Sequence, residues 1–194
     1  MSPPRRIAFL AFPGLTALDL VGAYDALRRL APLGIDPAVR VRIVGTAPEV
    51  ADESGLVLRP ESVFEDLAHF DLLYVPGGLG TRRLMHDPHL LAYLRSWGRT
   101  RPLASVCTGA LLLGQAGYLA DRRATTHHRA WELLRPLCRE LVTDRRIVDE
   151  GQVVTAAGVA AALDLGLYLV EKFWGPAARE AIAAQMEYRA YSPL

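Results

Sequence analysis

The sequence predicts an α/β protein built on a mostly parallel sheet with helices on both faces. Short apolar runs of strand length alternate with longer segments of helical periodicity, the order expected of parallel strands joined by crossover helices. Leu72–Val75 is apolar at every position, which indicates a strand buried on both faces. With 194 residues the chain is long enough for one full core, and we expect residues 1–194 to form a single domain.

Five apolar runs are the candidate strands, in this order: Ile7–Phe12, Val39–Val44, Leu72–Val75, Leu103–Val106 and Val153–Ala156. Apolar residues recur at helical spacing in three intervening segments: Thr16–Leu30, Pro88–Gly98 and Val159–Phe173. A turn near Asp149–Gln152 predicts a hairpin before the last strand, and Gly175-Pro176 separates the long helix from a final one.

Charge and cysteine content limit the classes of function. Lys and Arg number 22 against 21 Asp and Glu, so a formal net charge of +1 gives no reason to expect nucleic acid as a partner. The apolar run Ile7–Phe12 stops at Pro13-Gly14, too short for a secretory signal or a membrane span. We therefore expect a cytoplasmic location, no membrane association, and no disulfide between Cys107 and Cys138.

Cys107 stands between the predicted strand Leu103–Val106 and a predicted helix that starts at Thr108. A strand-to-helix turn strains the backbone of its central residue and requires small neighbours, which Ser105 and Gly109 supply. The free N–H groups of the helix N-terminus favour thiolate, so we expect a lowered pKa at a nucleophilic Cys107. An ionised Asp19 nearby would oppose this, so we expect Asp19 to be protonated when the thiolate forms. The alternative is a small buried cysteine at a strand end.

Gly77 and Gly78 follow the buried strand Leu72–Val75. Residues without side chains let backbone N–H groups point into a cleft at the carboxyl end of a strand. Together with the N–H of Thr108 they are candidates for an oxyanion hole. Taken alone, the same glycines equally fit a tight turn between strand and helix.

His127 and Asp19 are the candidate proton-transfer groups. His127 lies 20 residues after Cys107, beyond a β-prone stretch, and one strand-helix-strand step would return it to the edge of the sheet beside the cysteine. His128 is its neighbour, and a surface position is the alternative. Asp19 lies between apolar residues near a helix start, where it needs a partner or a raised pKa, or else is a favourable charge in a helix capped by Thr16.

His86 and His89 begin a polar helix, and we expect them to be solvated. We therefore expect no metal site and no cofactor.

Five segments in this order resemble the PfpI/ThiJ superfamily of class I glutamine amidotransferase-like proteins. They are Phe12–Gly14 with Leu18–Gly22, Val75–Gly78, Ser105–Ala110, Arg123–His127 and Thr155–Val159. The resemblance implies a flavodoxin-like three-layer sandwich with a nucleophile elbow. Asp19 and Cys107-Thr108-Gly109 look like the isonitrile hydratase branch and the amidase-like domains of AraC-type regulators.

Carried over by residue, the resemblance makes Cys107 the nucleophile, Asp19 its acidic partner and Thr108 a helper. Gly77, Gly78 and Gly158 would form the oxyanion and substrate-binding part, and His127 would contribute to the site. The superfamily also implies a homodimer. Its contact surface could be the first helix, from which Ala17, Val21 and Tyr24 could face outward.

The function implied is a small-molecule hydratase that converts an isonitrile to an N-substituted formamide through a Cys107 thioimidate. One alternative is a stand-alone ligand or redox sensor related to the regulator domains. The other is a glyoxalase- or deglycase-like enzyme whose thiolate adds to a 2-oxoaldehyde.

Overall fold

A seven-stranded sheet is the centre of the structure, a computed structural model that describes residues 2–188. Its strands are β1 (Arg6–Ala11), β2 (Arg40–Gly45), β5 (Ser62–Val63), β6 (Leu72–Val75), β7 (Leu103–Val106), β10 (Ile147–Asp149) and β11 (Val153–Ala156). The order across the sheet is β10-β11-β7-β6-β1-β2-β5. All neighbouring strands of this sheet run parallel except the hairpin β10–β11. The predicted fold class is confirmed.

Two pairs of very short strands lie outside this sheet: β3 (Val50–Ala51) with β4 (Val57–Leu58), and β8 (Arg123–Ala124) with β9 (Glu140–Leu141). The helices are α1 (Ala17–Arg28), α2 (Thr81–Leu84), α3 (Pro88–Arg95), α4 (Gly109–Gln115), α5 (Trp131–Leu134), α6 (Ala161–Trp174) and α7 (Pro176–Gln185). Single 3₁₀ turns occupy Leu67–His69, His128–Ala130 and Arg135–Leu137.

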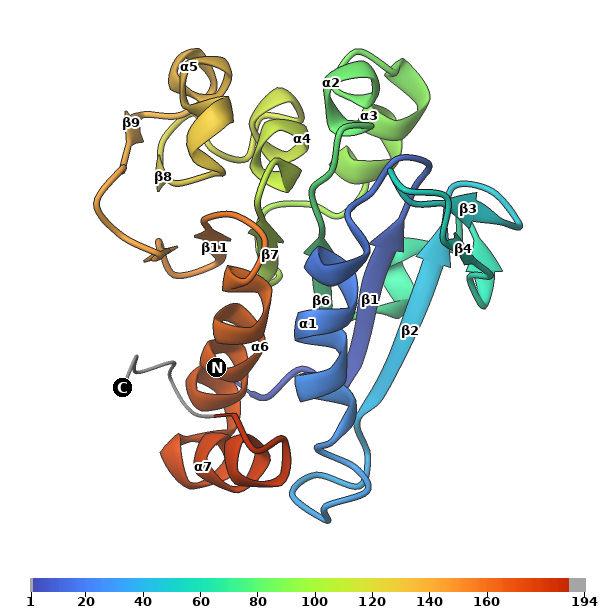
Figure 1. Ribbon diagram of the computed structural model, residues 1–194, viewed down its shortest axis with the longest axis vertical. Coiled ribbons are helices and arrows are strands. Elements are labelled where there is room, and N and C mark those ends of the chain that lie inside the picture. Colours follow the sequence, from blue (N-terminus) through green and yellow to red (C-terminus); the bar gives the residue numbers. More distant parts are fainter. Residues whose placement is uncertain (1, 189–194) are drawn as a thin grey trace.

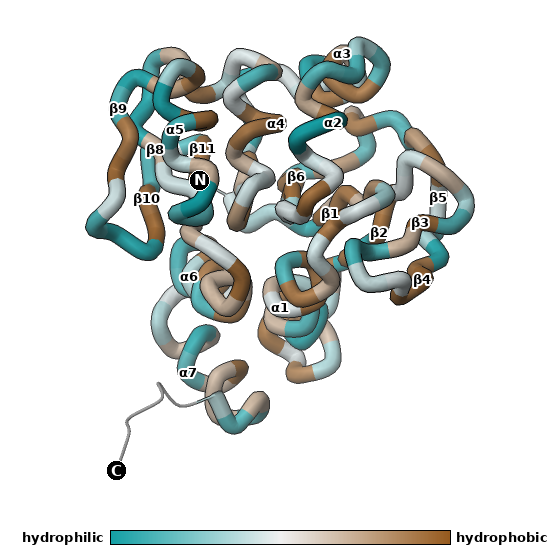
Figure 2. The backbone as a smooth tube through the Cα atoms, turned by 45° about the horizontal axis from the view of Figure 1, so that its top comes forward, coloured by the Kyte–Doolittle hydropathy of each residue, from teal (hydrophilic) through white to brown (hydrophobic). Residues whose placement is uncertain are grey.

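Helices cover both faces of the sheet. The helices α1 and α6 pack against each other on one face (Figure 1). In the turned view the strands lie between this pair and the layer that contains α3 and α4 (Figure 2). The central strands β6 and β7 are buried at every position, as expected of strands covered on both sides.

The predicted elements are present, but the helices predicted over Thr16–Leu30 and Pro88–Gly98 end earlier, at Arg28 and Arg95. Strands β1 and β2 are each displaced by one residue from the predicted run, and β6, β7 and β11 match it. The predicted helix from Val159 begins only at Ala161, because Val159 has φ of +25°, which a helix cannot continue through. Thr16 is the N-cap of α1, but its side chain makes no capping hydrogen bond. Its backbone N–H donates to the carbonyl of Gly77.

The predicted path to His127 is wrong. The stretch before it, β8, pairs with β9 in a separate small sheet, while the neighbours of β7 are β6 and β11. The N–H of Thr125 donates to the side-chain hydroxyl of Thr155 on β11, at 2.9 Å, rather than to a strand backbone. His127 therefore approaches the sheet from a loop beyond the carboxyl end of β11.

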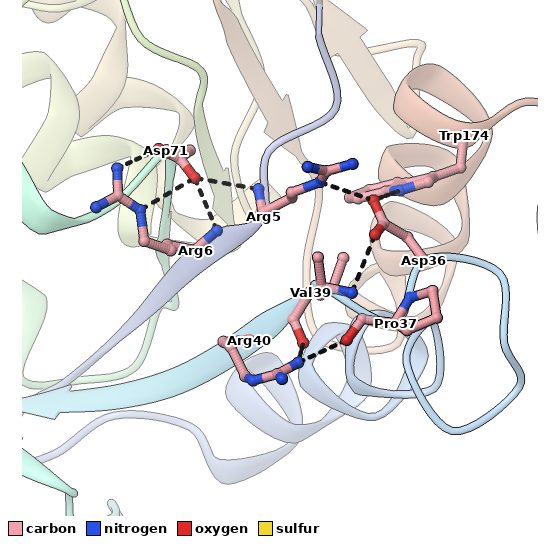
Figure 3. A network of polar contacts seen from close by, with 9 residues as sticks. Arg5, Arg6, Asp36, Pro37, Val39, Arg40, Asp71 and Trp174 are labelled. Atoms are coloured by element: carbon pink, nitrogen blue, oxygen red, sulfur yellow. Dashed lines mark hydrogen bonds and ion pairs between the residues drawn. The ribbon is translucent and has the colours of Figure 1, made fainter.

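Polar contacts hold the amino ends of the strands, opposite to the carboxyl ends (Figure 3). Asp71, just before β6, accepts hydrogen bonds from the backbone N–H groups of Arg5 and Arg6 and pairs with the Arg6 guanidinium at 2.9 Å. Asp36 accepts from the Trp174 indole and from Arg5. These contacts tie β1, β6 and α6 together at one edge.

None of the helices within residues 2–188 combines the length and the apolar character needed to cross a membrane.

The first helix presents part of the surface that we expected at a dimer contact. Val21 is 40% exposed, and so is Leu18 on the same helix. Tyr24, in contrast, is half-buried, and its ring packs edge-on against Phe9 at 5.6 Å, so it does not face outward. Ala17 is half-buried as well.

We predict a homodimer through α1. The wild type is expected to sediment at twice the chain mass at micromolar concentration, and Val21→Glu should shift it toward the mass of one chain, since a buried unpaired carboxylate is costly. Val63→Glu is the matched control, because Val63 is 42% exposed on the edge strand β5. A wild type that sediments as one chain would contradict the dimer.

Candidate active site

The carboxyl ends of β1, β6, β7 and β11 meet at one edge of the sheet, where parallel strands of open α/β folds present their ligand sites. The segments that follow these strands bring together Asp19, Gly77, Cys107 and Val159. This edge is opposite to the polar network of Figure 3.

Cys107 occupies a strained turn between β7 and α4. Its φ is +54°, a left-handed backbone that non-glycine residues rarely adopt. Gly109 allows the tight turn, because a Cβ there would lie 2.4 Å from the carbonyl oxygen of Val75. The strand-to-helix elbow predicted from the sequence is therefore present.

Three backbone contacts hold the strained residue in place. The N–H of Cys107 donates to the carbonyls of Ala156 and Ala157, each at 3.0 Å, at the end of β11. The hydroxyl of Thr126 donates to the carbonyl of Cys107 at 2.7 Å. The conformation is thus fixed by neighbouring segments rather than by the turn alone.

Asp19 lies in the first turn of α1 and is fully buried. Its Oδ2 accepts a hydrogen bond from the N–H of Gly77 at 3.0 Å, and its backbone carbonyl accepts from the Tyr74 hydroxyl at 2.9 Å. Oδ1 is buried too and has no hydrogen-bond partner within residues 2–188, while the Cys107 thiol lies close enough to the carboxyl to favour its ionised form. Burial raises the pKa of Asp19 from 3.8 to about 7, and the bonds with Cys107 and Gly77 only partly offset this.

The thiol does not titrate as the sequence led us to expect. Burial, followed by the charge of Asp19, raises the pKa of Cys107 to about 12, although the backbone N–H groups of Thr108 and Val159 favour the thiolate. The lowering of the Cys107 pKa that we expected from the helix N-terminus is therefore wrong, because burial and Asp19 outweigh the backbone N–H groups. Two adjacent acids lose their protons in steps that belong to the pair, so above about pH 7 the two groups share one negative charge.

Thr108 and Gly78 bond to each other. The hydroxyl of Thr108 accepts from the N–H of Gly78 at 2.9 Å and donates to its carbonyl at 3.0 Å. The N–H of Gly77 is taken by Asp19, and that of Thr108 points to the sulfur. The backbone donors that we expected to form an oxyanion hole are thus engaged within the protein, and a substrate oxygen would reach Gly78 by displacing the Thr108 hydroxyl.

His127 lies beside the same pocket as Cys107. Its Nδ1 accepts from the N–H of Arg129 at 3.2 Å, so in the neutral ring the proton resides on Nε2. Burial, then His128 and nearby arginines, lower the pKa of His127 below 6.5, which favours that neutral form. Gly158 packs against the ring, since a Cβ there would lie 2.1 Å from His127 Cδ2.

A pocket of about 230 Å³ opens onto the sulfur. Its lining consists of Thr16, Glu53, Gly78, Leu79, Arg82, Cys107, Thr108, His127, Arg129 and Val159. Asp19 lies behind this lining, so a molecule in the pocket meets the sulfur first. Within the described part of the chain there is no group of three or more His, Cys, Asp or Glu that could hold a metal ion, and His86 and His89 are exposed.

Sequence reasoning missed several residues of this site. Tyr74 and Thr126 anchor the backbones of Asp19 and Cys107, and their hydroxyls within predicted β segments were the available signal. Nothing in the sequence distinguishes Val159, whose strained backbone directs its N–H at the sulfur. Arg82 lies two residues after Gly80, the last glycine of the turn, and its position could have suggested a pocket residue.

A strained cysteine at a strand-to-helix turn, on the carboxyl edge of a parallel sheet and beside a buried acid, defines a flavodoxin-like α/β protein with a nucleophile elbow. Residues 5–172 match the DJ-1/PfpI family, and the chain belongs to that family.

The similar proteins include an enzyme and a regulator. Isonitrile hydratase of Pseudomonas putida is 38% identical over 191 residues, which are 97% of this chain and 81% of that protein. The HTH-type transcriptional regulator CdhR of Pseudomonas aeruginosa is 30% identical over 170 residues, and the match spans only 50% of its length. A THiJ/PfpI family protein from Pseudomonas syringae has a TM-score of 0.85 at 30% identity, covering 100% of this chain and 78% of that chain.

We predict that Asp19 makes the protein less stable as the pH rises from about 4 to about 7. The folded protein retains a proton that the unfolded chain, with an ordinary pKa of 3.8, has already lost, so the stabilisation present below pH 4 disappears by about pH 7. The difference in unfolding free energy between wild type and Asp19→Asn should fall across this range. In Asp25→Asn, on the same helix, the sign is reversed, because Arg29 and Arg28 help to lower that carboxyl's pKa. A difference in unfolding free energy between wild type and Asp19→Asn that does not change with pH would contradict a buried, protonated Asp19.

We also predict that alkylation of Cys107 by iodoacetamide accelerates as the pH rises through about 7, where the pair loses its first proton. In Asp19→Asn the inflection should move to higher pH, because the thiol must then ionise alone in a buried place. Cys138, half-buried with a pKa raised by burial, is the reference within the same chain. Identical pH profiles at the two cysteines would exclude a coupled Asp19–Cys107 pair.

Proposed function

We propose that the protein is a cysteine-dependent hydratase that converts isonitriles to N-substituted formamides. The observation that carries this proposal is the buried Asp19–Cys107 pair at a strained elbow, which holds one proton near neutral pH next to a nucleophile. The 38% identity to isonitrile hydratase across 97% of this chain supports the substrate class.

The first step uses the form of the singly charged pair in which the proton has passed to Asp19 from the sulfur, where the higher pKa of Cys107 otherwise holds it. The Cys107 thiolate attacks the terminal carbon of the isonitrile, a C–S bond forms, and Asp19 delivers its proton to that carbon. The product is an N-substituted thioformimidate on Cys107, and Asp19 is left as a carboxylate. The Thr108 and Val159 N–H groups favour the thiolate state from which this step starts.

Water completes the reaction. It adds to the thioformimidate carbon, and the proton it gives up passes through Asp19 to the substrate nitrogen. The C–S bond then breaks, the sulfur leaves with the bonding electron pair as thiolate, and the hydroxyl proton returns to Asp19. One water is added to the isonitrile, a formamide is released, and no oxidant or cofactor is consumed. The neutral His127, with its proton on Nε2, would be a hydrogen-bond donor to the substrate or to this water.

A ligand-sensing role is the second candidate, because two HTH-type regulators of Pseudomonas aeruginosa, CdhR and GbdR, match the chain at 30% and 26% identity. The chain spans about half the length of each regulator. Such a role needs only binding in the pocket, and no proton at Asp19. The two candidates therefore differ in what Asp19→Asn does.

We predict that purified wild type hydrates an aryl isonitrile to its formamide and that Cys107→Ala has no measurable activity. Asp19→Asn keeps the shape of the side chain but cannot deliver a proton, so its turnover should fall by roughly 10²–10⁴-fold. Formamide release followed by chromatography measures this, with circular dichroism to verify folding. The matched control is Asp25→Asn, a charge removed from the same helix outside the pocket, which should keep wild-type turnover.

A folded Asp19→Asn variant with wild-type turnover would eliminate the proton-delivery role. A wild type that binds isonitriles without hydrating them would favour the sensor.

A further inference from the structure

We propose that the Cys107 pocket selects substrates that carry a carboxylate, held by the guanidinium groups of Arg82 and Arg129. The inference rests on the proposed function only for the identity of the reacting group. The selection of an anion is a property of the pocket itself.

Two of the arginines without a guanidinium partner within residues 2–188 line the Cys107 pocket. Most described arginines bond through the guanidinium to a carboxylate or to a backbone carbonyl. Within residues 2–188 the guanidinium groups without such a partner are those of Arg82, Arg83, Arg129 and Arg145. Arg82 and Arg129 line the Cys107 pocket, and Arg145 lines an adjoining hollow that also contains His127 and Val159.

Both signs of charge line the pocket. Glu53, whose Oε2 accepts from the N–H of Leu79 at 3.3 Å, contributes to raising the pKa of Asp19. Arg82 and Arg129 contribute to lowering the pKa of His127, so these two cations lie near its ring. A substrate with its reacting carbon at the sulfur and a negative group toward His127 would bring that group to the two guanidinium groups.

A planar carboxylate matches the hydrogen-bond donors of these groups. Guanidinium forks bind carboxylate in a planar, two-point geometry, and a neutral His127 with its proton on Nε2 adds a further donor. The pocket of about 230 Å³ is smaller than the roughly 300–1,000 Å³ of common ligand sites. The negative group must therefore lie only a few bonds from the reacting carbon.

Iodoacetate and iodoacetamide test the preference without any turnover. Both transfer a two-carbon group to the Cys107 sulfur: a C–S bond forms and iodide leaves with the bonding pair. They differ in that iodoacetate carries a carboxylate and iodoacetamide a neutral amide. We expect the iodoacetate-to-iodoacetamide rate ratio at Cys107 to exceed the ratio at Cys138 by about tenfold, and to fall as salt is added. Peptide mass spectrometry measures both cysteines in one sample.

The variants identify the groups responsible. Arg82→Gln and Arg129→Gln should each lower the ratio at Cys107 by about 3–10-fold, as expected for loss of one charged donor. Arg83→Gln should leave it unchanged, since Arg83 is an unpaired exposed arginine on the same helix as Arg82 but outside the pocket. Arg82→Lys, which keeps the charge without the fork, should give an intermediate ratio and serves if the Gln variant does not fold.

A ratio at Cys107 no higher than that at Cys138, or an equal loss in Arg83→Gln, would overturn the proposal. Turnover of isocyanoacetate and of its methyl ester then tests the substrate itself. We expect the acid to have the higher kcat/KM, and Arg82→Gln to remove this difference in kcat/KM. If neither isonitrile is hydrated, the hydratase proposal fails while the alkylation ratio still decides on the anion. A methyl ester turned over as well as the acid would overturn the anion proposal and leave the hydratase intact.

Discussion

The contact between Asp19 and Cys107 is the constraint on which the rest of the site depends. Two acids meet in a buried place, and Gly77 makes the approach possible, because a Cβ there would lie 2.8 Å from both Asp19 Oδ2 and Cys107 Cβ. Desolvation forbids two adjacent charges, so the pair keeps one proton until strongly alkaline pH. The helix α1, the turn after β6 and the turn after β7 must all be placed to hold this one contact.

The strain at this contact is offset by segments that do not react. Cys107 and Val159 both have positive φ, and such residues persist only where their surroundings fix them. The carbonyls at the end of β11 and the hydroxyl of Thr126 fix Cys107, while Tyr74 fixes the backbone of Asp19. Because these groups are buried and closely packed, the sulfur and the carboxyl cannot relax apart at low cost.

The sequence was most informative where one local cause decides the outcome. Burial on both faces predicts β6 and β7, and small residues around Cys107 predict the elbow, because these effects act within a few residues. The thiol pKa was misjudged, since it depends on burial and on Asp19, 88 residues away in the chain. The path to His127 was wrong because a Thr125–Thr155 bond replaces strand pairing. The positive φ of Val159 follows from no local pattern in the sequence.

The shared proton also bears on which chemistry the site suits. An oxidation sensor works best with a thiolate that persists and is exposed, whereas here burial raises the thiol pKa and Cys107 is only 5% exposed. A hydratase needs a thiolate only at the moment of attack, together with an acid that gives up its proton at the same moment. A pair that holds one proton above about pH 7 supplies both from a single charge state. The arrangement therefore favours addition of the sulfur to an electrophilic carbon over oxidation of the sulfur.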